Sequence, residues 1–304
     1  RPADPPTAMD TRNAFLVDAF TDEPTDGNPA GVLPDGDGLD ADQMGAIANE
    51  LGASETAFVR ESEVADRQFR YFTPETEVDL CGHATIASHA LLYERGAIDA
   101  GKHTVETEAG VIEVSIGEDG LVWMTQNDPT VTELDVDHKR VADALGVDAE
   151  SISAVGLPVA RTSTGLPFLA VPVEYFSDLS GMDPDQRAIA ALSEEHDATG
   201  IYAFTFDTLE GASTLHGRMF APGAGVEEDP VTGTASGAVG AYLDRLGALE
   251  ETAAMTFEQG HFLDRPGTVS VSIGAEVKVG GRAVTTLEGS IVVPESDDDE
   301  IIEV

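Results

Sequence analysis

Residues 70–98 read RYFTPETEVDLCGHATIASHALLYERGAI, and residues 218–249 read RMFAPGAGVEEDPVTGTASGAVGAYLDRLGAL. In each stretch an Arg-x-Phe-x-Pro segment precedes a pair of glycines fourteen residues apart, Gly82 with Gly96 and Gly233 with Gly247. Self-similarity at a fixed offset is typical of duplicated architecture. Because the offset is about half of the chain, the pattern predicts two similar domains, each with a glycine-led helix, at 82–95 and 233–245.

The segments around these two helices follow one order in both halves. Apolar runs predict strands at 13–20, 55–59, 68–73, 168–173, 201–206 and 217–220, and helical spacing predicts further helices at 40–51 and 184–195. An Asp-Gly turn at Asp119-Gly120 predicts a hairpin within 103–126. Many strands with few helices predict an α+β fold of sheets wrapped around central helices, not a Rossmann sheet. We expect the first half to comprise 10–127 with a returning strand at about 282–296, and the second half 128–281.

The composition indicates a folded and strongly acidic protein. The 304 residues are 41% hydrophobic and have a formal net charge of −41, from 57 acidic and 16 basic side chains. Such a charge repels itself in dilute buffer, whereas molar salt shortens the Debye length to ~3 Å. We therefore predict adaptation to a high-salt cytosol. The acidity argues against nucleic acid and anionic membranes as partners, since both need clustered Lys and Arg.

Targeting and terminal features predict a cytoplasmic protein. No apolar run approaches the ~20 residues of a membrane span, no signal peptide is visible, and a single cysteine excludes an intrachain disulfide. Residues 1–8 read as a vector-derived remnant ahead of a native start at Met9, and 295–304 as a solvated acidic tail.

Two residues of the first half are candidates for proton transfer or substrate binding. Glu55 opens an apolar strand, opposite in face to Thr56 and Phe58, where burial of a carboxyl raises its pKa toward neutrality. The alternative is one more surface charge. His83 lies in the first turn of the Gly82 helix, where a neutral imidazole could hydrogen-bond a substrate. The alternative is a capping or core histidine.

The residues beside the two leading glycines are further candidates. Cys81 at a helix N-terminus is either a thiolate of lowered pKa or a small buried apolar residue. In the second half Thr232, Gly233 and Thr234 take the places of Cys81, Gly82 and His83. Asp229 precedes them, either complementing the helix dipole or belonging to an anion site.

No motif in the sequence indicates a bound metal or cofactor. No His, Cys and Glu cluster has metal-ligand spacing, and no GxGxxG or P-loop is present. We therefore predict neither a metal nor a cofactor.

Seven segments, in this order, resemble the PhzF-like family, the phenazine-biosynthesis isomerases and their relatives. They are VDAFTDEPTDGNPAGVL at 17–33, ELGASETAFV at 50–59, RYFTPETEVDLCGHAT at 70–85, TSTGLPFLAV at 162–171, RMFAPGAGVEEDPVTGTASG at 218–237, EQG at 258–260 and VGGRAVTTLEGSIVV at 279–293. The resemblance implies the diaminopimelate-epimerase-like fold, with two pseudo-symmetric domains, each a rolled, mostly antiparallel sheet around a central helix. It also implies a homodimer.

The resemblance implies catalytic roles for Glu55, as the proton shuttle, and for His83 and Asp229. Cys81, Gly82, Thr232, Gly233 and Thr234 are the implied substrate-binding residues. The family often has serine where this chain has Thr234, so the hydroxyl is kept and a methyl is added. The amino-acid epimerases of the wider fold use one cysteine in each half, but Thr232 stands opposite Cys81 here. A hydroxyl is a far weaker base than a thiolate, which disfavours a two-cysteine racemase.

These observations predict a cofactor-independent isomerase that moves a proton within a small carboxylate-bearing metabolite. Glu55 would remove the proton from one carbon and return it to another. Two alternatives remain open at this point. One is an epimerase or racemase, including a one-carboxylate variant, and the other is a non-catalytic protein that binds a small acid.

Overall fold

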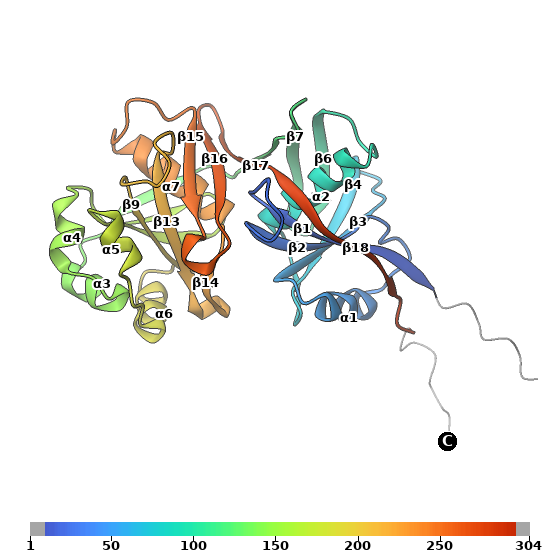
Figure 1. Ribbon diagram of the computed structural model, residues 1–304, viewed down its shortest axis with the longest axis horizontal. Helices are drawn as coiled ribbons and strands as arrows, with labels where there is room; N and C mark the ends of the chain where they lie inside the picture. The colour runs from blue at the N-terminus through green and yellow to red at the C-terminus, as the bar shows by residue number, and fades with distance from the viewer. Residues whose placement is uncertain (1–9, 296–304) are drawn as a thin grey trace, which may run out of the picture.

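The computed structural model describes residues 10–295, which form two lobes joined by β-strands (Figure 1). The predicted remnant at 1–8 and residues 296–304 of the predicted acidic tail lie outside the described residues. The N-terminal lobe contains β1 (Thr11–Ala19), β2 (Asn28–Leu33), α1 (Ala41–Leu51), β3 (Glu55–Arg60), β4 (Arg67–Phe72), β5 (Glu77–Val78), α2 (Gly82–Glu94), β6 (Gly101–Thr107), β7 (Gly110–Ile116), β8 (Val122–Thr125) and β18 (Ala283–Val292).

The C-terminal lobe contains more helices, and three of them were not predicted. Its elements are β9 (Thr130–Glu133), α3 (His138–Leu145), α4 (Ala149–Ala154), β10 (Ala160–Ser163), β11 (Pro167–Pro172), α5 (Phe176–Ser180), α6 (Gln186–Glu195), β12 (Gly200–Thr205), β13 (Leu215–Ala221), the 3₁₀ turn η1 (Pro222–Ala224), β14 (Val226–Asp229), α7 (Gly233–Arg245), β15 (Met255–Gln259), η2 (His261–Leu263), β16 (Gly267–Ile273) and β17 (Val277–Gly281).

The strands of the two lobes pair in the same order. In the N-terminal lobe the order is β18-β1-β2-β3-β4-β6-β7-β8, with β2–β3 and β4–β6 parallel and the other pairs antiparallel. In the C-terminal lobe it is β9-β10-β11-β12-β13-β15-β16-β17, with β11–β12 and β13–β15 parallel. An antiparallel pairing of β8 with β17 joins the two into one curled sheet. The predicted α+β fold of two rolled, mostly antiparallel sheets is confirmed.

Each rolled sheet encloses one helix (Figure 1). Residues 84–92 of α2 are buried without a break, and so are residues 235–243 of α7. A helix that is apolar on all sides is stable only inside a core. In α7 the packing needs glycine, because a Cβ on Gly240 would lie 2.6 Å from Val271 Cγ1. The two helices are therefore packed on all sides over most of their length, and this packing positions their N-termini.

The outer helices cover the outside of the sheet. Helix α1 packs its Met44 and Ile47 against Phe58 and Phe72 of β3 and β4. Helices α3, α4, α5 and α6 form a second layer over β11, β12 and β13. In the part of the chain that the structure describes, no helix is long and apolar enough to cross a membrane.

Candidate active site

The two glycine-led helices begin at equivalent points with backbone N–H groups that have no acceptor within their own helix. Cys81 and Thr232 are the extended N-cap residues of α2 and α7. The first backbone bonds of the helices run from Thr85 N to Cys81 O and from Ser236 N to Thr232 O, each 3.0 Å long. The preceding N–H groups, those of the leading glycine and the next two residues, point out of each helix. Each N-terminus is thus suited to bind an anion.

The two N-termini lie next to each other although they belong to different lobes. A Cβ on Gly82 would lie 3.7 Å from Thr234 Oγ1, which is van der Waals contact between the two first turns. Gly233 faces the other way and is buried, and a Cβ there would lie 2.9 Å from Phe20 Cζ. The predicted substrate-binding residues of the two halves are therefore brought together.

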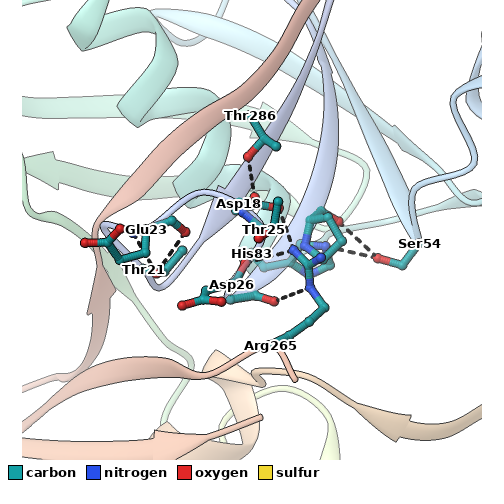
Figure 2. Close-up of polar contacts among 11 residues, drawn as sticks. Asp18, Thr21, Glu23, Thr25, Asp26, Ser54, His83, Arg265 and Thr286 are labelled. Atoms are coloured by element: carbon teal, nitrogen blue, oxygen red, sulfur yellow. Dashed lines mark hydrogen bonds and ion pairs between the residues drawn. The ribbon is translucent and has the colours of Figure 1, made fainter. Parts of the chain in front are cut away.

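Glu55 and His83 meet at the N-terminus of α2. Glu55 is the first residue of β3, and its Oε2 lies 3.4 Å from His83 Nε2. The side chains of Glu55 and His83 are 24% and 12% exposed, so each is screened from water yet reachable. The same His83 nitrogen lies 3.3 Å from Ser54 Oγ, and Figure 2 shows this contact. Cys81 Sγ lies 3.4 Å from His83 Nδ1. Both ring nitrogens of His83 thus have polar partners.

Asp229 is held by three side chains in front of α7. Its Oδ1 accepts a 3.0 Å hydrogen bond from Asn28 Nδ2, and its Oδ2 accepts one from the Thr232 hydroxyl. Gln259 Nε2 donates to the Asp229 carbonyl at 2.8 Å, and Asn28 also donates to the Val231 carbonyl at 2.9 Å. Asn28 comes from β2 of the N-terminal lobe, so the two lobes share this cluster.

The charges of the Glu55–His83 pair and of Asp229 act on each other. Burial raises the pKa of Asp229, as does the charge of Glu55, while His83 and the hydrogen bonds from Thr232 and Asn28 act in the opposite direction. Burial also raises the pKa of the Cys81 thiol well above its usual value, assisted by the charges of Glu55 and Asp229. Of the two alternatives for Cys81, the structure favours the small buried residue over the thiolate of lowered pKa, because burial outweighs the backbone N–H groups of Ala84 and His83.

The absence of a bound metal stays a prediction, although the structure brings three side chains of ligand type together. Ligand atoms of Glu55, Cys81 and His83 all lie within 4.8 Å of one another. The spacing along the sequence hid this group, because folding brings Glu55 to α2 from a separate strand.

Three residues of the site were not predicted: Ser54, Asn28 and Gln259. The signals for them were present in the GNP and EQG segments that contribute to the family resemblance, and in the serine of SET. Neutral amides and hydroxyls have no charge that singles them out in a sequence, so their contacts were needed to identify them.

An ion pair beside the site ties the lobes together (Figure 2). Arg265, from the C-terminal lobe, contacts Asp18 at 2.6 Å and donates to the carbonyls of Asp26 and Gly27 at 2.8 and 2.9 Å. Asp18 also accepts hydrogen bonds from the backbone of Thr25, at 2.8 Å, and from the Thr286 hydroxyl. The pair supports the loop that leads into Asn28.

The fold is that of the epimerase-like isomerases. A hydroxyproline epimerase from Agrobacterium vitis has the same fold, with a TM-score of 0.58 at 16% identity, covering 92% of this chain and 91% of that chain. Within that class, the chain belongs to the phenazine biosynthesis-like protein family (PhzC-PhzF), whose family model matches residues 17–289. The resemblance stated from the sequence is therefore confirmed.

Two members of the family are similar over nearly their whole length. An uncharacterized isomerase of Bacillus subtilis is 39% identical over 293 residues, which cover 95% of this chain and 98% of that relative. The crystal structure of a PhzF-family phenazine biosynthesis protein from Bacillus anthracis matches with a TM-score of 0.85 at 34% identity, covering 94% of this chain and 100% of that chain. The expectation that the chain is an enzyme of the isomerase class is confirmed.

Proposed function

We propose that the protein moves a proton between two carbon atoms of a small carboxylate-bearing metabolite. The observation that supports this most directly is the pairing of Glu55 Oε2 with His83 Nε2, at 3.4 Å, beside two adjacent helix N-termini. A carboxylate can accept a proton from carbon, and the N–H groups can hold an anion within reach of it. Family membership adds support, since the relatives are named isomerases.

In the proposed reaction the substrate carboxylate binds at the N-termini of α2 and α7. Glu55 takes a proton from an adjacent carbon, and the electron pair of the broken C–H bond moves into the conjugated system of the substrate. The protonated Glu55 then returns the proton to a second carbon, so that atoms and charges balance. His83 donates a hydrogen bond to the substrate as negative charge develops. All these groups are side chains or backbone, so the proposed reaction needs no cofactor.

Asp229 has a proposed role in orienting the substrate from the second half. Its carboxyl is fixed by Asn28 and Thr232, and its raised pKa favours the protonated form more than in water. A protonated carboxyl can donate a hydrogen bond to a substrate oxygen. Thr234 supplies a hydroxyl near Gly82 for the same purpose.

The arrangement around Cys81 favours the isomerase over a two-base epimerase. Its thiol has a raised pKa, and the hydroxyl opposite, that of Thr232, donates to Asp229. Neither group is a ready base at neutral pH. Glu55 is therefore the proposed base in both directions of proton transfer.

The test uses Glu55→Gln, which keeps the shape and removes the base. A panel of small carboxylic acids is incubated in heavy water at molar salt and followed by proton NMR. We expect wild-type protein to move a proton and to wash in deuterium, and the variant to be slower by about 10²–10⁴-fold. Glu50→Gln, an exposed substitution on α1, is the matched control and should match wild type.

Three outcomes contradict the proposal. Retained turnover in Glu55→Gln would remove Glu55 from the mechanism. Deuterium exchange at one stereocentre, without movement of a double bond, would show an epimerase. Tight binding of an acid without any wash-in would show a binding protein.

A further inference from the structure

Three potential metal ligands converge beside the N-terminus of α2. The Glu55 carboxylate, the Cys81 thiol and the His83 imidazole all lie within 4.8 Å of one another. Cys81 is 7% exposed, and the His83 side chain is 12% exposed. Because β3 and α2 lie in the rigid core, the three side chains are held near each other before any ion arrives.

The separation of Glu55 and His83 fits a tetrahedral zinc ion, whereas the thiol has to be repositioned. Zinc bonds are about 2.3 Å to sulfur, about 2.0–2.1 Å to nitrogen and about 2.0–2.2 Å to oxygen. At tetrahedral angles these lengths separate nitrogen from oxygen by roughly 3.4 Å and sulfur from nitrogen by roughly 3.6 Å. His83 Nε2 lies 3.4 Å from Glu55 Oε2 and 3.9 Å from Cys81 Sγ. Cys81 Sγ lies 3.4 Å from His83 Nδ1, closer than to Nε2, so coordination through Nε2 requires the Cys81 or the His83 side chain to change rotamer.

We propose that Glu55, Cys81 and His83 bind zinc or a similar thiophilic divalent cation through Oε2, Sγ and Nε2, and that the bound ion inhibits the enzyme. On binding, the S–H bond of Cys81 breaks, a sulfur–metal bond forms and the proton passes to the buffer. The fourth position stays open to water. The inhibition rests on the proposed function, because an ion bound to Glu55 occupies the oxygen that would accept the substrate proton.

The single cysteine makes this site distinguishable from other cation sites on the protein. The chain has 57 acidic side chains, so divalent cations will also associate with its surface. Carboxylates are oxygen ligands, whereas a sulfur–metal bond gives a charge-transfer absorption of its own. Since Cys81 is the one cysteine in the sequence, that absorption reports this site alone.

The probe is cobalt(II), titrated into the substrate-free protein in molar potassium chloride. We expect a thiolate-to-cobalt charge-transfer band in the near ultraviolet that saturates at one ion per chain and disappears when zinc is added. Cys81→Ser should lose the band. His83→Asn and Glu55→Gln should keep cysteine but weaken cobalt binding by about 10-fold or more, since each removes one ligand. Glu50→Gln is the control and should titrate like wild type.

The spectroscopic arm and the activity arm separate the two proposals. The metal site is overturned if folded wild-type protein shows no band. It is also overturned if His83→Asn and Glu55→Gln both bind cobalt with wild-type affinity. Either result holds whether or not the protein turns over substrate. If the band is present, zinc should inhibit turnover, and a chelator should restore it. A zinc-loaded protein that turns over at the metal-free rate would overturn the inhibition. Absence of turnover without metal contradicts the proposed function and leaves the band intact.

Discussion

At the scale of single residues, Asn28 does more for the site than its neutral side chain suggests. It is 1% exposed, and its Nδ2 group donates to Asp229 Oδ1 and to the Val231 carbonyl. One amide from β2 therefore fixes the segment that leads into α7 of the other lobe. A carboxyl that must present one oxygen to a substrate needs such a fixed partner, because a free rotation would misplace it.

Asn28→Ala should lower both stability and turnover. It leaves buried acceptors at Asp229 and Val231 without their donor, which costs about 1–3 kcal/mol of unfolding free energy. We expect kcat to fall about 10-fold or more and to fall further than the affinity for substrate, because Asp229 loses its orientation. Chemical denaturation and steady-state kinetics measure the two effects.

Asn49→Ala is the matched control for this prediction. Asn49 is exposed on α1 and donates to the Pro74 carbonyl at 3.3 Å. We expect Asn49→Ala to lower the unfolding free energy by less than about 0.5 kcal/mol. Equal effects of the two substitutions on kcat would refute the orienting role of Asn28.

The sequence was sufficient to select Glu55, His83 and Asp229 as candidates, because each departs from its surroundings or matches a family segment. It was not sufficient to find the partners of Asp229. Asn28 lies 201 residues before Asp229, and no local pattern connects residues so far apart. The structure was also needed for the pKa of Cys81, since the N-terminal position alone predicts the wrong direction.

At the scale of elements, the helices that could be predicted are those with a strong and repeated pattern. Helix α7 has the predicted bounds, and α2 ends one residue earlier than predicted. Helices α3, α4 and α5 were missed because they are only eight, six and five residues long and have no counterpart in the first half. For α3, the N-cap Asp137 and the left-handed Gly146 were usable signals.

The buried His89 of α2 should make the protein sensitive to acid. It is 2% exposed, and its Nδ1 donates to the Thr85 carbonyl at 2.8 Å. Burial lowers the pKa of His89 to about 4 from the ordinary value of 6.5, although that hydrogen bond acts in the opposite direction. Between these two values the unfolded chain binds more protons, so stability is complete above pH 6.5 and is lost as the pH falls toward 4. The loss is about 3 kcal/mol at pH 4.

His89→Gln tests this by keeping a donor for the Thr85 carbonyl without a group that titrates. Urea denaturation at pH 7 and pH 4.5 gives the loss of stability for each protein. The loss of unfolding free energy between pH 7 and pH 4.5 should be smaller in the variant than in wild type by about 2 kcal/mol. This is the part of the His89 contribution that is already lost at pH 4.5. His138→Gln, on α3, controls for the removal of any histidine. An identical loss in wild type and His89→Gln would mean that other groups cause the acid sensitivity.

At the scale of the whole molecule, one strand pairing joins the two rolled sheets. Val122–Thr125 of β8 pairs with Val277–Gly281 of β17, and Gly280 allows the close approach, since a Cβ there would lie 2.7 Å from Trp123 Cδ2. The internal repeat predicted two similar units, but not which edges would meet. An edge pairing depends on both partners being exposed at once, and that information is not local to either strand.

The ion pair of Arg265 with Asp18, a further link between the lobes, should be important for stability. The Asp18 side chain is 3% exposed, so removal of its cationic partner leaves a buried charge. Breaking a buried ion pair in this way lowers the unfolding free energy by about 3–5 kcal/mol. We expect a loss at the lower end of this range because the Arg265 side chain is 27% exposed. Arg265→Gln measured by denaturation at molar salt tests this. Lys139→Gln removes the exposed pair with Asp143 and should leave the midpoint unchanged.

The two substitutions should also differ in their response to salt. Salt screens exposed charges much more than buried ones. The loss of unfolding free energy caused by Arg265→Gln should therefore be the same at 0.1 M and at molar salt, to within about 1 kcal/mol. If molar salt abolished this loss of stability, the result would show that Asp18 is exposed to water in solution.

The net charge of −41 sets the response of the whole protein to salt. With 57 acidic and 16 basic residues on 304, like charges outnumber the cations that could pair with them, and the folded state concentrates the repulsion. Raising the ionic strength from 0.1 M to 1 M shortens the Debye length from ~10 Å to ~3 Å, below the spacing of most surface charges. We expect the melting temperature to rise by roughly 10 °C, equivalent to a few kcal/mol for a chain of this size. Potassium chloride and sodium chloride should act equally at matched ionic strength, since screening depends on charge alone. A melting temperature that does not rise between low and molar salt would exclude adaptation to high salt. A much larger rise with one cation than with the other would indicate specific ion binding instead of screening.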